Sequence, residues 1–126
     1  MATVKHYREL VCWQLSVELR SSVIAVTDRA GVRRNLRFCD QIGRSTRSAP
    51  ANIAEGFNRS NVEFMRYLGI ALGSLRETEN HVDEALERRY VSPEEHDRLR
   101  TLARRSIRAA EELRAYLRRR NDGQHR

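Results

Sequence analysis

Residues 48–60 read SAPANIAEGFNRS and stand in the middle of a chain whose other segments carry helical patterns. A helix that passes through Pro50 loses one amide donor and has the proline ring against its preceding turn, so it should bend there. The bend frees the carbonyl of Thr46, and Asn52 and Ser48 can supply polar groups close to it. We therefore expect one helix, kinked at Pro50.

The second half of this stretch combines charges with a small residue. Glu55 and Arg59 are one helical turn apart, which is the spacing of a helical ion pair, and helical geometry places Arg37 and Arg44 on the same outer face. Gly56 lets a neighbouring backbone approach closely. A bent helix with surface ion pairs explains the charges, whereas a boundary between subunits explains the charges and the glycine together.

Four helices are predicted, over residues 9–30, 33–58, 60–90 and 92–119. The first should end at Gly31, because glycine commonly terminates helices. Capping boxes open the last two helices, Ser60 with Glu63 and Ser92 with Glu95. Connections this short favour antiparallel neighbours, so we expect an all-α fold, an antiparallel up-down four-helix bundle.

Apolar residues at helical spacing predict the core and the domain limits. Helix 60–90 carries one stripe: Phe64, Leu68, Ala71, Leu75, Thr78, Val82 and Ala85. Helix 92–119 carries another: Leu99, Leu102, Ser106, Ala109, Leu113 and Tyr116. A chain of 126 residues is the usual size of one domain. We expect a lead-in over residues 1–8, a bundle domain over 9–119 and a basic disordered tail over 120–126.

The faces left after the core is assigned favour self-association. On helix 60–90, Gly69 and Gly73 lie opposite the core stripe, although glycine costs a helix about 1 kcal/mol relative to alanine. Helix 9–30 has one apolar stripe through Cys12, Leu15, Leu19, Val23 and Val26 and a second through Leu10, Trp13, Val17 and Ile24. A bundle helix needs only one stripe, so the second predicts a subunit interface. The alternative is a first helix that its neighbours bury deeply.

Charge is distributed unevenly along the chain. The net charge is +7, and 23 of the 24 basic residues are arginine. Residues 98–120 hold nine arginines against Glu111 and Glu112, whereas residues 76–97 hold three arginines against eight carboxylates. The planar guanidinium group suits phosphate, so a stripe of arginines predicts a nucleic-acid partner. The candidate nucleic-acid-binding residues lie on or beside the face away from the core: Arg100, Arg104, Arg105, Arg108, Arg114, Arg118 and Arg119. The alternative is that these arginines pair with the acidic helix, within or between subunits.

Motifs for catalysis, cofactors or membranes do not emerge. The four histidines are scattered, and the Glu-x-x-His pairs of di-iron bundles, phosphate-binding glycine loops and HExxH are absent. No apolar run approaches the roughly 18 residues that span a bilayer, and the N-terminus lacks an apolar signal segment. We expect a non-enzymatic cytoplasmic protein without metal or cofactor. Two cysteines without CxxC spacing are expected to be buried, reduced thiols.

Four segments together resemble a known family. They are Leu10-Val11-Cys12-Trp13-Gln14, Gln41-Ile42 with Arg44, Pro50-Ala51-Asn52-Ile53-Ala54-Glu55-Gly56 with Arg59, and Ala71-Leu72-Gly73-Ser74-Leu75 with Glu77. Over residues 7–117 the chain is similar to the four-helix-bundle proteins encoded by intervening sequences in 23S ribosomal RNA genes. It departs from many relatives at residues 27–33, where they carry aromatic residues and proline.

The resemblance implies more about fold and assembly than about activity. It implies a ring-shaped homopentamer and kinship with the accessory variability protein of diversity-generating retroelements, a basic pentamer that binds nucleic acid and partners a reverse transcriptase. The motif and subunit-interface candidates are Arg44, Asn52, Glu55, Gly56, Arg59, Arg66, Gly69, Gly73 and Glu77.

The residues and the resemblance lead to one expectation of function. We expect a homo-oligomeric bundle protein that binds the phosphates of RNA or DNA. The alternatives are a scaffold that binds an acidic protein partner or a reverse transcriptase, and a nuclease that uses scattered carboxylates.

Overall fold

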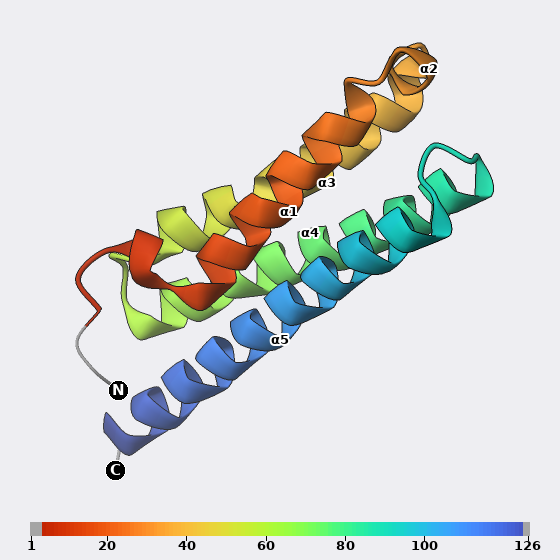
Figure 1. Ribbon diagram of the computed structural model, residues 1–126. Helices are drawn as coiled ribbons and strands as arrows, with labels where there is room; N and C mark the ends of the chain where they lie inside the picture. The colour runs from red at the N-terminus through yellow and green to blue at the C-terminus, as the bar shows by residue number, and fades with distance from the viewer. Residues whose placement is uncertain (1–3, 125–126) are drawn as a thin grey trace.

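A computed structural model describes residues 4–124, and these residues are all-helical, without a strand (Figure 1). A 3-10 turn, η1 (Tyr7–Glu9), precedes the helices α1 (Val11–Thr27), α2 (Ala30–Arg33), α3 (Leu36–Gly56), α4 (Asn61–Glu87) and α5 (Pro93–Gln124). The four long helices form a bundle in which α1 packs against α3 and α5, and α4 packs against the same two helices. The described chain ends lie at the same end of the bundle (Figure 1).

The core contains the stripe that was predicted on α4. All seven of its residues, from Phe64 to Ala85, are buried, and Leu68 and Leu75 are fully so. Leu19 of α1 and Ile53 of α3 are also completely enclosed. Burial of a side chain of this size stabilises a fold by about 1.5–3 kcal/mol, so these positions hold the helices together.

The core face of α5 differs from the prediction by a rotation of the helix. Leu99 and Ser106 are buried as expected, but Leu102, Ala109, Leu113 and Tyr116 are only half-buried. The fully buried positions instead follow Ala103, Ala110 and Leu117. The small side chains of Ala103 and Ala110 allow α5 to pack closely against α1 and α4, whereas Leu102, Leu113 and Tyr116 keep part of their surface exposed.

Gly31 does not end the first helix, contrary to the prediction. Helix α1 ends at Thr27, where the backbone amide of Asp28 donates to the carbonyl of Ile24. Arg29 is extended, and a short helix, α2, follows and contains Gly31. The next helix begins at Leu36 because Asn35 caps it, accepting a hydrogen bond from the amide of Phe38.

The other ends follow local capping rules to different degrees. Ser92 and Glu95 form the predicted capping box of α5, in which Glu95 accepts a hydrogen bond from the amide of Ser92 at 2.9 Å. Ser60 caps α4 by accepting from the amide of Glu63, but of the predicted box only this half is present in the described residues. Helix α4 ends at Glu87, before the expected Tyr90. Arg89 there adopts the left-handed conformation with φ 62°, and the amide of Tyr90 donates to the carbonyl of Ala85, a closing turn that usually uses glycine.

The disordered tail predicted over residues 120–126 is wrong for residues 120–124, because α5 continues to Gln124. Residues 125–126 lie outside the described part. Long arginine side chains favour helix, and Arg120 donates to the hydroxyl of Tyr116 one turn earlier at 3.1 Å. The bundle therefore carries a basic helical extension beyond its expected end.

Helix α3 runs without a break from Leu36 to Gly56 and includes Pro50. The side-chain amide of Asn52 donates to the carbonyl of Ser48 at 2.8 Å and contacts its hydroxyl at 3.0 Å. Local polar support beside the proline is thus present as expected, at Ser48 rather than at Thr46. The kink itself stays a prediction.

Candidate nucleic-acid interface

Six of the seven candidate arginines of α5 fall into two groups, and Arg100 belongs to neither. Arg104 and Arg114 lie against α4, where Arg104 Nε donates to Glu79 Oε2 at 2.9 Å and Arg114 Nε donates to the carbonyl of Met65 at 3.2 Å. Arg100 is half-buried. The exposed group consists of Arg105, Arg108, Arg118 and Arg119, and none of these four makes an ion pair within residues 4–124. The exposed group is therefore the part of the predicted stripe that no acidic partner within residues 4–124 engages.

Two arginine ion pairs and one contact between a histidine and a carboxylate join α4 and α5 along their outer seam. Besides Arg104 and Glu79, Arg76 pairs with Glu111 at 3.1 Å, and His96 Nε2 lies 2.7 Å from Asp83 Oδ1. The alternative interpretation, in which basic residues pair with the acidic helix, thus holds for some of the arginines. Because these pairs are partly exposed, each contributes little to stability, about 0–1 kcal/mol.

Gly56 is not on an outer face, so its assignment to a subunit interface is corrected. It is buried against α4, and a Cβ atom there would lie 2.6 Å from Tyr67 Cβ and 3.0 Å from a ring carbon of Phe64. The glycine is required within the subunit, where the end of α3 crosses the start of α4. Glu55 and Arg59 beside it do form the predicted ion pair, at 2.6 Å.

Tyr67 is a contact residue that the sequence did not indicate. The guanidinium carbons of Arg59 and Arg66 lie 5.0 and 4.6 Å from its ring centroid, and Arg66 also pairs with Glu63 at 3.1 Å. Arg59 belongs to the turn before α4, so only the folded turn brings it to this ring. Tyr67 therefore makes two cation–π contacts within the subunit.

The remaining interface candidates have different surroundings. Gly69 is half-buried, and a Cβ atom there would lie in ordinary contact with Arg114, 3.4 Å from one of its nitrogens, so its place at an interface stays a prediction. Gly73 is exposed, with nothing within 4 Å of its Cβ position. Arg44 and Glu77 are exposed, and Arg44 pairs with Asp40 at 3.3 Å.

The two apolar stripes of α1 are not equally buried. The stripe through Cys12 and Leu19 is buried along its whole length, whereas the second contains buried Leu10 and half-buried Trp13, Val17 and Ile24. Helix α1 lies against both α3 and α5, so its neighbours within the subunit cover part of the second stripe. Deep burial by neighbours, the alternative to an interface, therefore explains some of this pattern.

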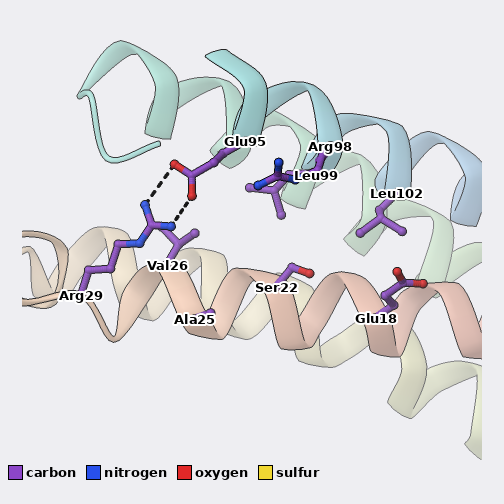
Figure 2. Close-up of a pocket in the computed structure, with 9 residues that line it drawn as sticks. All are labelled: Glu18, Ser22, Ala25, Val26, Arg29, Glu95, Arg98, Leu99 and Leu102. Atoms are coloured by element: carbon purple, nitrogen blue, oxygen red, sulfur yellow. Dashed lines mark hydrogen bonds and ion pairs between the residues drawn. The ribbon is translucent and has the colours of Figure 1, made fainter. Parts of the chain in front are cut away.

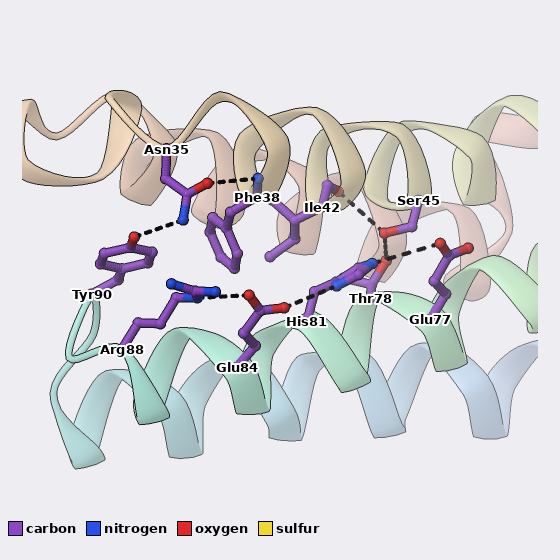
Figure 3. Close-up of polar contacts among 10 residues, drawn as sticks. All are labelled: Asn35, Phe38, Ile42, Ser45, Glu77, Thr78, His81, Glu84, Arg88 and Tyr90. Atoms are coloured by element: carbon purple, nitrogen blue, oxygen red, sulfur yellow. Dashed lines mark hydrogen bonds and ion pairs between the residues drawn. The ribbon is translucent and has the colours of Figure 1, made fainter.

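A seam of small polar side chains joins α3 and α4 (Figure 3). The hydroxyls of Thr78 and Ser45 are 2.8 Å apart, as are those of Ser74 and Ser48. Beside them Thr46 Oγ1 is buried without a hydrogen-bond partner in the described residues. The predicted core stripe of helix 60–90 included Thr78, but which hydroxyls meet across the helices was not evident from the sequence.

His81 is enclosed at the same seam. Both of its ring nitrogens are buried without a hydrogen-bond partner among residues 4–124. Glu77 and Glu84 approach it only to 3.6 and 3.8 Å, which is too far for hydrogen bonds (Figure 3). The pair of Glu77 and His81 has no further ligand, and no group of three or more potential metal ligands occurs in the described part of the chain.

Arg29 and Glu95 fasten the opposite seam, between α1 and α5 (Figure 2). Arg29 bonds both carboxylate oxygens of Glu95 and donates to the carbonyl of Tyr90 at 3.0 Å. The hydrogen bond from Arg29, with that from the Ser92 amide, lowers the pKa of Glu95 from 4.5 to about 2. This contact connects the turn between α1 and α2 to the turn between α4 and α5. A pocket adjoins it, and Ser22, Ala25 and Val26 of α1 line part of that pocket.

Neither cysteine is an activated thiol. Burial raises the pKa of Cys12 from 9.0 to about 11, and burial with the nearby charge of Asp28 raises the pKa of Cys39. Cys12 is buried as expected, whereas Cys39 is only half-buried. A raised pKa leaves little thiolate near neutral pH. In the part of the chain that the structure describes, no helix is both long and apolar enough to cross a membrane.

Comparison with known proteins identifies one family. No curated protein matches the chain. The model of the 23S rRNA-intervening sequence proteins matches residues 8–117, which include helices α1 to α4 and α5 as far as Leu117. The match covers most of the bundle and includes the motif around Asn52, Glu55 and Gly56. The chain therefore belongs to the 23S rRNA-intervening sequence protein family.

Proposed function

We propose that this protein is a non-enzymatic, homo-oligomeric bundle that binds the phosphate backbone of RNA or DNA. The observation that carries the proposal is the exposed group of α5, Arg105, Arg108, Arg118 and Arg119, which makes no ion pair within residues 4–124. Arginines without acidic partners are available for bidentate phosphate contacts. The family description, which refers to an intervening sequence of ribosomal RNA, is compatible with an RNA partner.

The binding proposed here is electrostatic and does not read base sequence. The exposed group lies on one helix, separated by two acidic residues, Glu111 and Glu112, of which Glu111 is already paired with Arg76. A surface of this kind contacts phosphates without selecting bases, so affinity should depend steeply on salt. The proposal includes no cofactor and places the protein in the cytoplasm.

The finer features of assembly are part of the same proposal. We infer that the bundle has up-down order with a kink at Pro50 and assembles into a ring, a homopentamer. The surroundings of Gly73 support the assembly, because nothing lies within 4 Å of its Cβ position. On the same outer side of α4, the side chains of Ile70 and Val62 are 42% and 55% exposed. A subunit that packs there would cover apolar side chains and use the space above the glycine. Kinship with the accessory retroelement protein stays a prediction.

The test is fluorescence anisotropy of labelled structured RNA and duplex DNA against nuclease-treated protein, over a salt series. The variant replaces Arg105, Arg108, Arg118 and Arg119 by glutamine. Its matched control replaces four other exposed arginines, Arg33, Arg34, Arg37 and Arg47, so both proteins carry the same net charge. We expect the α5 variant to bind more weakly, with a salt slope on duplex DNA that is smaller by about 0.9 for each phosphate that it no longer neutralises.

Two results would contradict the proposal. Equal weakening in the variant and its control would show that net charge alone, and not the α5 surface, controls binding. Absence of binding by the unchanged protein even at low salt would favour an acidic protein partner for the exposed group.

A further inference from the structure

A hollow of about 210 Å³ lies on the outer seam between α4 and α5. Three of its six lining residues are arginines: the lining consists of Leu72, Arg76, Glu111, Arg114, Ala115 and Arg118. Since a water molecule takes up about 30 Å³, the space can hold a group the size of a phosphate with accompanying water. Three guanidinium groups against one carboxylate leave the lining with an excess of positive charge.

Arg114 is held in place before any ligand arrives. Its Nε donates to the carbonyl of Met65, and its guanidinium lies across Gly69, where a side chain would meet it at 3.4 Å. The arginine thus lies within van der Waals range of the Gly69 position, and Ala115 adds a small side chain to the lining. A cation fixed by the backbone loses less conformational entropy when it binds an anion.

Arg76 is held by a partner that an anion can replace. Arg76 and Glu111 pair at 3.1 Å, with side chains that are 55% and 53% exposed. A pair this exposed contributes little to stability, so its carboxylate is easily exchanged for another oxyanion. Arg118, one helical turn after Arg114, is exposed and makes no ion pair in the part of the chain described.

We propose that this hollow is a phosphate-binding site, in which Arg76, Arg114 and Arg118 hold the phosphate oxygens and Glu111 competes with the ligand for Arg76. The geometry of Arg76 and Glu111 resembles an anion site occupied by an internal carboxylate. When phosphate enters, Glu111 turns toward solvent and Arg76 turns to the ligand. The phosphate comes either from a nucleic-acid backbone or from a free phosphate compound. The site depends on the proposed function only if the phosphate belongs to a nucleic-acid backbone.

The competition predicts opposite effects for the two members of one ion pair. Glu111→Gln should strengthen phosphate binding by about two- to fivefold, because it removes a competitor worth no more than an exposed ion pair. Arg76→Gln should weaken it by a similar factor. If the pair only stabilised the bundle, both substitutions would act in the same direction. Both side chains are exposed, so circular dichroism should show an unchanged fold for each.

Each variant has a matched control outside the hollow. Glu112→Gln removes the same charge from the neighbouring exposed residue of α5. Arg88→Gln removes an exposed arginine at the end of α4 that is likewise paired with a glutamate, Glu84, at 2.7 Å. The five proteins are titrated with labelled RNA by anisotropy and with pyrophosphate by calorimetry.

The results separate this site from the proposed function. Tighter binding by Glu111→Gln than by Glu112→Gln, with weaker binding by Arg76→Gln than by Arg88→Gln, supports the site. If this contrast appears with RNA, the phosphate is that of a backbone, and if it appears with pyrophosphate but not with RNA, the site binds a free phosphate compound and does not depend on the nucleic-acid function. If RNA binds but neither RNA nor pyrophosphate distinguishes the variants from their controls, the site is overturned and the function is left. No binding of either ligand overturns both.

Discussion

A Cβ atom on Gly56 would lie 2.6 Å from Cβ of Tyr67, closer than two such atoms approach in folded proteins. Gly56 is the last residue of α3, and its missing side chain lets the end of this helix cross α4. Gly56→Ala should therefore lower the free energy of unfolding by about 1–3 kcal/mol through overpacking, as measured by urea denaturation.

Gly31 provides the control for this substitution. It is helical and exposed, and nothing lies within 4 Å of its Cβ position. Gly31→Ala should raise the free energy of unfolding by about 0.5–1 kcal/mol, because alanine restricts the unfolded chain more than glycine does. A similar change in both variants would show that the contact with Tyr67 is not limiting.

The polar seam of α3 and α4 predicts opposite effects for two buried threonines. Thr46→Val should stabilise the protein by about 1 kcal/mol, because its hydroxyl is buried without a hydrogen-bond partner in the described residues. Thr78→Val should destabilise it by about 1–3 kcal/mol, since the Thr78 hydroxyl bonds the Ser74 carbonyl at 2.9 Å and the Ser45 hydroxyl at 2.8 Å. Thermal unfolding of both variants against the parent protein measures the difference, and loss of stability in Thr46→Val would contradict it.

Glu95 makes stability depend on acid pH. Because the pKa of Glu95 is lowered from 4.5 to about 2, the ionised carboxylate stabilises the folded state above about pH 4.5, and this contribution is lost as the pH falls toward 2. Glu95→Gln should be less stable than the parent near neutral pH, with a shallower decline of Tm between pH 4.5 and 2. Glu94→Gln, a neighbouring exposed residue without an ion pair in residues 4–124, should keep the steeper decline of the parent.

Gly73 tests assembly separately from folding. Since its Cβ position is open, Gly73→Leu should leave the helix content of the subunit unchanged while displacing any neighbour that packs closely on α4. Light scattering should show a smaller particle for the variant, and circular dichroism should show an unchanged spectrum. A parent protein that is monomeric at micromolar concentration, or a variant that assembles equally well, would remove Gly73 from an interface.

Much of the helical pattern was accessible from the sequence because it follows rules that act within one or two turns. Ser60 and Ser92 cap the helices that they precede, the stripe from Phe64 to Ala85 is buried, and Glu55 pairs with Arg59. The end of α4 was less accessible, because Arg89 takes a left-handed conformation in which glycine would be expected. The hydrogen bond from the amide of Tyr90 to the carbonyl of Ala85 supports that conformation, and no residue type in this segment predicts the bond.

The candidate site divides in the same way. The sequence identified α5 as arginine-rich, but it did not separate Arg104 and Arg114, which α4 engages, from the exposed arginines beside them. Nor did it show that Gly69 receives Arg114 of its own subunit. Each of these outcomes depends on the rotation of α5 about its axis, and the alternation of medium and large apolar residues on that helix is compatible with more than one rotation.

The sequence by itself determined the all-helical class, the caps of α4 and α5, the buried stripe of α4 and the family, because propensity, capping and apolar spacing are properties of neighbours along the chain. Only the tertiary structure decided that Gly56 serves packing within the subunit, that Arg29 reaches Glu95 and that Arg76 and Glu111 meet beside a hollow. Contacts between distant segments depend on how closely and in what rotation the helices pack, and that is set by side-chain volume across the whole core rather than by any local pattern.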